Sequence, residues 1–349
     1  MEATLESPAS YGFRDHERVR QSGDNLRQRI YYPATGRSGS RATVLPGSYP
    51  LVLFAHGHRG QGSGLCPQNP DQDFQRWGGV LHLLARCGMV VTSVDVSEAL
   101  DPNPAGSERV AGLLEQAWDY IDNRWEHRDI IKRHAERDED GRADHRRIFG
   151  VVGHSWGVGG CAEAAASRRL PVGAIASVAG TWESHVPALL ESAQRPTLFI
   201  AGTEDLTSAP GGGPYLGVDP PKHEAAVQHA GHWDWFDEDG LQPCNATSTN
   251  PCEVSYRIAG ELLTVFFHRY LLLRTDLPPS LLTMRRRWPW PWRWVYDNAD
   301  RPNLAAVFRR RGPCAVQVRW DVGQRNGWRP PLPPEGTQTL GRWTSNVAF

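Results

Sequence analysis

The chain has 349 residues, of which 40% are hydrophobic, so it is long enough for one α/β domain with an additional segment. Its 38 basic and 39 acidic residues give a net charge of -1, which argues against binding of nucleic acid or anionic membranes through overall charge. The 14 Trp, 10 Phe and 9 Tyr residues exclude general disorder, because they supply large apolar side chains for a core.

Several features bear on the compartment in which the protein works. The sequence has no apolar run of about 18 residues, so no transmembrane segment is expected. Residues 1–10 contain acidic Glu2 and Glu6 and no apolar block, so we expect no secretory leader and a cytoplasmic protein. Six Cys residues are too few for a disulfide scaffold. A disulfide between Cys244 and Cys252 would instead indicate a secreted protein.

Along most of the chain, the pattern of apolar residues predicts strands and helices in alternation. Strands are expected at residues 26–32, 51–55, 89–96, 148–152, 172–178, 197–201 and 224–230. Helices are expected at residues 73–87, 107–125, 156–168 and 253–273, and a solvated turn within the charged stretch 127–147. The alternation predicts crossover connections and a mostly parallel sheet with helices on both faces. In such sheets, ligands bind at the carboxyl ends of the strands.

Residues 276–349 interrupt this alternation, so we expect a main domain over residues 1–275 and a C-terminal extension over residues 276–349. The extension contains 12 Arg, no Lys and 5 acidic residues, a net charge of +7, together with half of all Trp. It is expected to form short β-strands, with residues 305–310 and 315–320 as a hairpin, or an arm that wraps the main domain. Its Trp side chains would either hold it in place or form an aromatic binding surface.

A Gly-His-Ser-Trp-Gly motif at residues 153–157 stands directly after an expected strand and directly before an expected helix. A Gly-x-Ser-x-Gly motif in this setting is typical of a nucleophile elbow, a sharp turn that lifts the serine hydroxyl clear of the sheet. The small residues on both sides let the strand and the helix approach closely. The sequence therefore predicts that Ser155 is a nucleophile, the alternative being a glycine-rich turn with an idle serine.

A serine hydroxyl is a weak nucleophile at neutral pH, so it needs a base and a group that orients the base. After a serine in such an elbow, the acid and then the histidine are expected further along the chain. Asp205 follows the strand expected at residues 197–201 and is the predicted acid, and His232 follows the next strand and is the predicted base. The competitors are Glu204 for the acid, and His223 and His229 for the base.

Acyl transfer also needs two backbone N–H donors for the oxyanion. One is expected from Trp156, at the start of the helix after Ser155, and the other from His58, in the glycine-rich loop after the first buried strand. On paper, His56, His58 and His154 resemble a metal cluster. No carboxylate or Cys spacing supports a metal, so neither a metal nor another cofactor is expected. His56 and His154 are instead expected to make local hydrogen bonds under the site.

Together, these motifs resemble the α/β-hydrolase superfamily over roughly residues 10–275. Within it, the chain is similar to the group of bacterial cutinases, polyester hydrolases, platelet-activating-factor acetylhydrolases and dienelactone hydrolases. The stretches that carry the resemblance are residues 31–33, 56–60, 153–160, 182–184, 202–205 and 231–232. The resemblance implies an α/β-hydrolase fold and a cleft whose walls include His58, Trp156 and Trp182.

The chain also departs from this group. A small or Met side chain usually follows the nucleophile, where this chain has Trp156, and residues 233–236 after the predicted base are bulkier than usual. These differences favour a narrower cleft than a polymer hydrolase needs. The sequence therefore predicts a serine ester hydrolase for a small-molecule or polymeric ester. The alternatives are an acyltransferase with the same three residues, and a non-catalytic binding protein with an aromatic C-terminal surface.

Overall fold

The structure of the chain is a computed structural model. It describes residues 5–6, 10–18, 26–57, 74–75, 77–132, 134–137, 143–146, 148–180, 183–205, 207–208, 218, 222–227, 230–232, 234–235, 255–272, 283–287, 293–297, 314–321 and 335–343.

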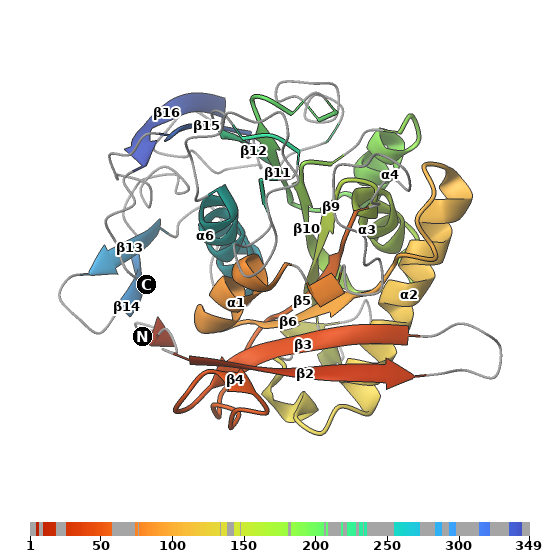
Figure 1. The fold of residues 1–349 in the computed structure, drawn as a ribbon, viewed down its shortest axis with the longest axis vertical. Coiled ribbons are helices and arrows are strands. Elements are labelled where there is room, and N and C mark those ends of the chain that lie inside the picture. Colours follow the sequence, from red (N-terminus) through yellow and green to blue (C-terminus); the bar gives the residue numbers. More distant parts are fainter. Residues whose placement is uncertain are drawn as a thin grey trace.

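Within these residues, one sheet of 11 strands dominates the fold, in the spatial order β16-β15-β12-β11-β10-β9-β5-β6-β3-β2-β4 (Figure 1). In chain order its strands are β2 (Ser10–Arg18), β3 (Leu26–Ala34), β4 (Gly39–Ser40), β5 (Leu51–Ala55), β6 (Val90–Val94), β9 (Phe149–His154), β10 (Val172–Val178), β11 (Thr197–Gly202), β12 (Lys222–Val227), β15 (Cys314–Asp321) and β16 (Glu335–Trp343). The six strands from β12 to β6 are parallel to one another. On either side of them, β3 with β2 and β15 with β16 continue the sheet in antiparallel fashion.

Helices cover both faces of this sheet (Figure 1). On one face lie α1 (Gly78–Arg86) and α6 (Ser255–Phe267), which continues into the π-helical turn η3 (His268–Leu272). On the other face lie α2 (Pro104–Asn123), α3 (Gly157–Ala166) and α4 (Val186–Ala193). The mostly parallel sheet between two helical layers confirms the α/β architecture predicted from the alternation of strands and helices.

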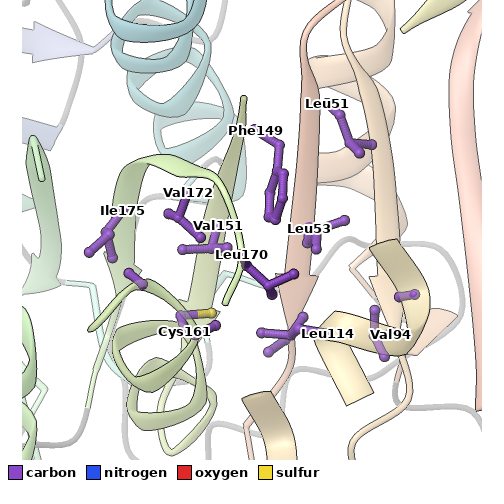
Figure 2. Close-up of a cluster of buried hydrophobic side chains, with 14 of the residues drawn as sticks. Leu51, Leu53, Val94, Leu114, Phe149, Val151, Cys161, Leu170, Val172 and Ile175 are labelled. Carbon is purple, nitrogen blue, oxygen red and sulfur yellow. The ribbon is translucent and has the colours of Figure 1, made fainter. Parts of the chain in front are cut away.

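Among the described residues, the core consists of two hydrophobic clusters, one on each face of the sheet. Side chains of β5 alternate between them: Val52 and Phe54 join the cluster with α1 and α6, whereas Leu51 and Leu53 join the cluster with α2 and α3. Figure 2 shows part of the second cluster, where Phe149 lies among these side chains, Leu114 of α2 and Cys161 of α3. Burial on both faces explains why the run 51–55 contains no polar residue.

The order of the parallel strands reverses at β5. The chain runs from β5 through α1 to its neighbour β6, and then returns through α2 to β9 on the opposite side of β5. In open α/β sheets, ligands bind at the carboxyl ends of the strands beside such a reversal. The segments that follow β5 and β9 are therefore placed where a site is expected.

The expected elements differ from the structure mainly at their boundaries. The helix expected at residues 73–87 begins only at Gly78, and the one expected at residues 107–125 begins already at Pro104. In the latter case Asn103 caps the helix, because its side chain accepts a hydrogen bond of 2.9 Å from the Gly106 N–H. The strand β2 and the helix α4 were not expected.

The charged stretch 127–147 was expected to be a solvated turn. It begins with the short 3₁₀-helix η2 (Arg128–Ile130), after which β7 (His134–Arg137) and β8 (Ala143–Arg146) pair as antiparallel strands. Charged residues thus form a small two-stranded sheet apart from the main one.

The described part of the C-terminal extension consists of short strands. β13 (Thr283–Arg287) and β14 (Arg293–Asp297) form a three-stranded sheet with β1 (Leu5–Glu6), while β15 and β16 extend the main sheet beside β12. Residues 315–320 lie in β15, and residues 305–310 of the expected hairpin lie outside the described residues. A domain boundary near residue 275 stays a prediction. In the part of the chain that the structure describes, no helix has the length and apolar character to cross a bilayer.

Candidate active site

Ser155 lies in a sharp turn between β9 and α3. Its backbone φ is +51°, in the left-handed region that residues other than glycine rarely adopt. Ser155 is 4% exposed. A Cβ on Gly153 would lie 2.5 Å from the backbone of Val158, and one on Gly157 would lie 2.6 Å from the carbonyl oxygen of His56. Only glycine fits at either position. The strand and the helix thus approach as closely as the motif predicts.

Three side chains from separate segments meet at this turn. The Oγ of Ser155 lies 3.0 Å from Nε2 of His232, and Nδ1 of His232 lies 3.0 Å from Oδ2 of Asp205. Asp205 follows β11 and His232 follows β12, so all three stand beyond the carboxyl ends of parallel strands. The arrangement is a hydroxyl, an imidazole and a carboxylate joined in series by hydrogen bonds.

The carboxylate of Asp205 is held ionised by its surroundings. Burial raises its pKa, but the hydrogen bond and charge of His232, with hydrogen bonds from Ser208 and Thr207, outweigh burial and bring the pKa well below its usual value. Oδ1 accepts from the Thr207 N–H at 2.9 Å, the Thr207 hydroxyl at 2.7 Å and the Ser208 N–H at 3.1 Å. Oδ2 accepts from the Ser208 hydroxyl as well as facing His232.

Sequence reasoning missed the part played by Thr207. Its Oγ1 also lies 2.7 Å from Nδ1 of His232. Because its single proton goes to Asp205, this hydroxyl can accept from the His232 Nδ1–H, which is then shared between Asp205 and Thr207. The available signal was the Asp-x-Thr-Ser spacing at residues 205–208, which is typical of a turn closed by an aspartate side chain.

Hydrogen bonds to several neighbouring groups anchor the turn that carries His232. The Gly231 N–H donates to Oδ2 of Asp234 at 2.7 Å, and the Ala230 carbonyl accepts from the Glu204 N–H at 3.0 Å. The His232 carbonyl accepts from Nε2 of His154 at 3.1 Å. The last two bonds join the segment after β12 to the segment after β11 and to the end of β9.

The competing residues have other surroundings. The carboxylate that contacts His232 belongs to Asp205, while the backbone of the neighbouring Glu204 bonds to Ala230. His223 is buried within β12, where its Nε2 lies 2.7 Å from the Tyr270 hydroxyl. His229 lies outside the described residues.

Two further histidines, His56 and His154, make local hydrogen bonds under the site, as the sequence predicted. Nε2 of His56 accepts a hydrogen bond of 3.0 Å from the Val96 N–H, and its Nδ1 lies 3.0 Å from the Gly57 carbonyl. His154 is fully buried and bonds to the backbone of His232. No group of three or more metal-ligating side chains occurs among the residues that the structure describes.

The predicted oxyanion hole and substrate walls are described only in part. Trp156 stands at the N-terminal end of α3, where the backbone dipole of the helix favours negative charge. The segment after β5 passes close to the nucleophile, because a Cβ on Gly57 would collide with the side chains of Ser155 and His154. His58 and Trp182 lie outside the described residues, as do Cys244 and Cys252, whose disulfide would indicate a secreted protein.

Of three comparisons with known proteins, the comparison with solved structures gives matches. No protein-family model matches the sequence, and no curated protein matches it. Among solved structures, the chain is similar to the crystal structure of a dienelactone hydrolase from Anabaena variabilis ATCC 29413. The identity is 20% and the TM-score 0.47, and the match covers 74% of this chain and 99% of that one.

The arrangement of the sheet itself identifies the fold. Six parallel strands lie between antiparallel neighbours, the strand order reverses at β5, and a glycine-flanked serine turn joins β9 to α3. The chain therefore has the α/β-hydrolase fold, as the sequence predicted. Because one such fold supports many reactions, the function has to be argued from the site.

Proposed function

We propose that the chain is a serine-dependent carboxylic ester hydrolase that works through Ser155, His232 and Asp205. The observation that supports this most is the series of two hydrogen bonds, each 3.0 Å, from Ser155 Oγ through the imidazole to Oδ2 of Asp205. A hydroxyl on a strained turn, a base in contact with it and a carboxylate behind the base are what activation of a serine requires.

In the proposed reaction, Ser155 Oγ attacks the ester carbonyl carbon while Nε2 of His232 accepts the hydroxyl proton. The ionised Asp205 accepts the hydrogen bond of Nδ1–H and stabilises the imidazolium that forms. The backbone N–H groups of Trp156 and His58 would hold the oxyanion of the tetrahedral intermediate. The alcohol then leaves with the proton from His232, and the acyl group stays on Ser155.

Water completes the cycle. His232 takes a proton from a water molecule as its oxygen attacks the acyl carbon, and it returns that proton to Ser155 Oγ as the acid leaves. These steps need no cofactor. An alcohol or thiol in place of water would give acyl transfer by the same groups.

The same residues suggest a short acyl group. Trp156 directly follows the nucleophile, and in this proposal its side chain forms one wall of the cleft with His58 and Trp182. A bulky wall at this place leaves little room for a long acyl chain. Rates measured on a series of p-nitrophenyl esters should fall steeply with acyl length, and comparable rates across the series would contradict a narrow cleft.

A fluorophosphonate probe, which reacts with activated serines, tests the proposal directly. The wild-type protein should be labelled and should hydrolyse p-nitrophenyl acetate, and Ser155→Ala should lose both properties. Ser107→Ala is the matched control, because Ser107 is another buried serine whose hydroxyl contacts a histidine, His185, at 2.9 Å. It should keep both. If the wild-type protein does not react with the fluorophosphonate, or if Ser155→Ala is labelled, the proposal is contradicted.

A further inference from the structure

Residues 154 and 155 hold His232 from two sides. The Ser155 hydroxyl contacts the imidazole at Nε2, and the side chain of His154 contacts the backbone carbonyl of the same residue at 3.1 Å. The ring centroids of His154 and His232 lie 5.1 Å apart, and those of His154 and Trp77 lie 4.7 Å apart. The elbow therefore contacts both the reacting end of His232 and its backbone.

His154 has the protonation state that this contact needs. The residue is fully buried, and burial together with the nearby charge of His232 lowers its pKa well below 6.5, so the ring is neutral. A carbonyl can only accept a hydrogen bond, so Nε2 must carry the proton of this neutral ring. A neutral donor also places no second positive charge beside His232 when that residue becomes protonated.

We propose that His154 is a positioning residue, whose Nε2–H bond to the His232 carbonyl keeps the His232 imidazole in line with Ser155 Oγ. Two other hydrogen bonds that anchor this turn come from Asp234 and Glu204, which belong to the turn itself and to the segment after β11. His154 alone of the three comes from the elbow. It thus couples the place of the base to the place of the nucleophile. This inference rests on the proposed function.

Two substitutions separate the hydrogen bond from the volume of the side chain. His154→Phe keeps a ring against Trp77 but removes the donor, whereas the side-chain amide of His154→Gln can place an N–H close to the former Nε2. For p-nitrophenyl acetate, His154→Phe should lower kcat about 10–100-fold with little change in KM, because a base displaced by a fraction of an ångström transfers the proton poorly. His154→Gln should recover activity to within about fivefold of wild type.

A matched control distinguishes positioning from general loss of a buried histidine. His268 is also fully buried with a lowered pKa, but it lies in the turn η3 that follows α6. His268→Leu should lower the melting temperature and leave kcat unchanged. If His154→Phe does not fold, the pair His154→Gln and His154→Asn decides, because the shorter Asn cannot reach the carbonyl and should show the loss in kcat.

Each outcome separates this inference from the proposed function. If the wild-type protein is active and both His154→Phe and His154→Asn have the same kcat as wild type, the positioning role is overturned. The esterase proposal then stays intact. Equal losses in His154→Gln and His154→Phe would also overturn it, since the donor would then be irrelevant. A wild-type protein that neither reacts with the fluorophosphonate nor hydrolyses esters would overturn both.

Discussion

At the scale of single residues, the donors around Asp205 fix both its charge and its direction. Both carboxylate oxygens accept hydrogen bonds, from Thr207, Ser208 and His232. With its pKa lowered by these contacts, Asp205 stays ionised at any pH at which esterase activity would be measured. Protonation of Asp205 therefore does not set the acidic limb of the pH profile.

The substitution Asp205→Asn tests the charge while keeping the shape of the side chain. An amide can donate to Nδ1 and would favour the tautomer of His232 that cannot accept the Ser155 proton. We expect kcat to fall about 10³–10⁴-fold in ester hydrolysis. Glu204→Gln, at the neighbouring competitor, is the control and should remain within about twofold of wild type. A larger loss in Glu204→Gln than in Asp205→Asn would identify Glu204 as the acid.

The chain order of serine, acid and histidine was enough to select the three side chains that the structure brings together. Their catalytic roles stay predictions. Thr207 was not selected, because a hydroxyl two residues after an aspartate is a common turn feature and gains meaning only when His232 lies beside it. The hydrogen bond from His154 to the His232 carbonyl could not be predicted from the sequence either, since it depends on where two backbone turns meet in space.

At the scale of elements, the elbow depends on how closely α3 approaches β5. A Cβ on Gly157 would lie 2.6 Å from the His56 carbonyl oxygen, which is backbone and cannot move aside alone. Gly157→Ala should therefore push α3 away, lower the free energy of unfolding by about 1–3 kcal/mol and reduce kcat. Urea denaturation and ester hydrolysis measure the two effects.

Gly112→Ala is the matched substitution for this test. Gly112 lies within α2, and a Cβ there would have no neighbour within 4 Å. Because alanine has a higher helix propensity than glycine, the free energy of unfolding of the variant should be higher by up to about 1 kcal/mol, with unchanged activity. Equal behaviour of the two variants would show that close packing at the elbow is unimportant.

Sequence patterns located the buried strands better than the peripheral elements. β5 and β10 have the expected bounds, because strands covered on both faces are largely apolar. β2 was not expected, since Arg14, Asp15 and other polar residues obscure its alternation and its pairing with β3 decides its structure. The helix α4 has only 8 residues, too few for a clear helical period.

At the scale of the whole molecule, buried histidines link stability to pH. Burial lowers the pKa of His82 and of His268 from 6.5 to about 4, and lowers that of His154 well below 6.5. The unfolded chain therefore binds protons at a higher pH than the folded chain does. The contribution of His82 and His268 to the free energy of unfolding is fully present above pH 6.5. It is lost as the pH falls from 6.5 toward 4.

His268→Leu should weaken this pH dependence. In the wild-type protein, His268 alone should cost about 2 kcal/mol of stability between pH 7 and pH 5, and the variant should lose that contribution. Urea denaturation at the two pH values gives the difference in the free energy of unfolding. An identical difference in wild type and variant would show that His268 does not contribute to acid sensitivity.

The reversal of strand order at β5 has a consequence for biosynthesis. As the chain leaves the ribosome, β5 and β6 emerge before β9, which covers the second edge of β5 and follows only after α2. Until then, the apolar segment Leu51–Ala55 presents an open edge to any other nascent or unfolded polypeptide. Recovery of soluble protein after dilution from denaturant should accordingly decline as the polypeptide concentration rises, and chaperones that shield such edges should restore the yield.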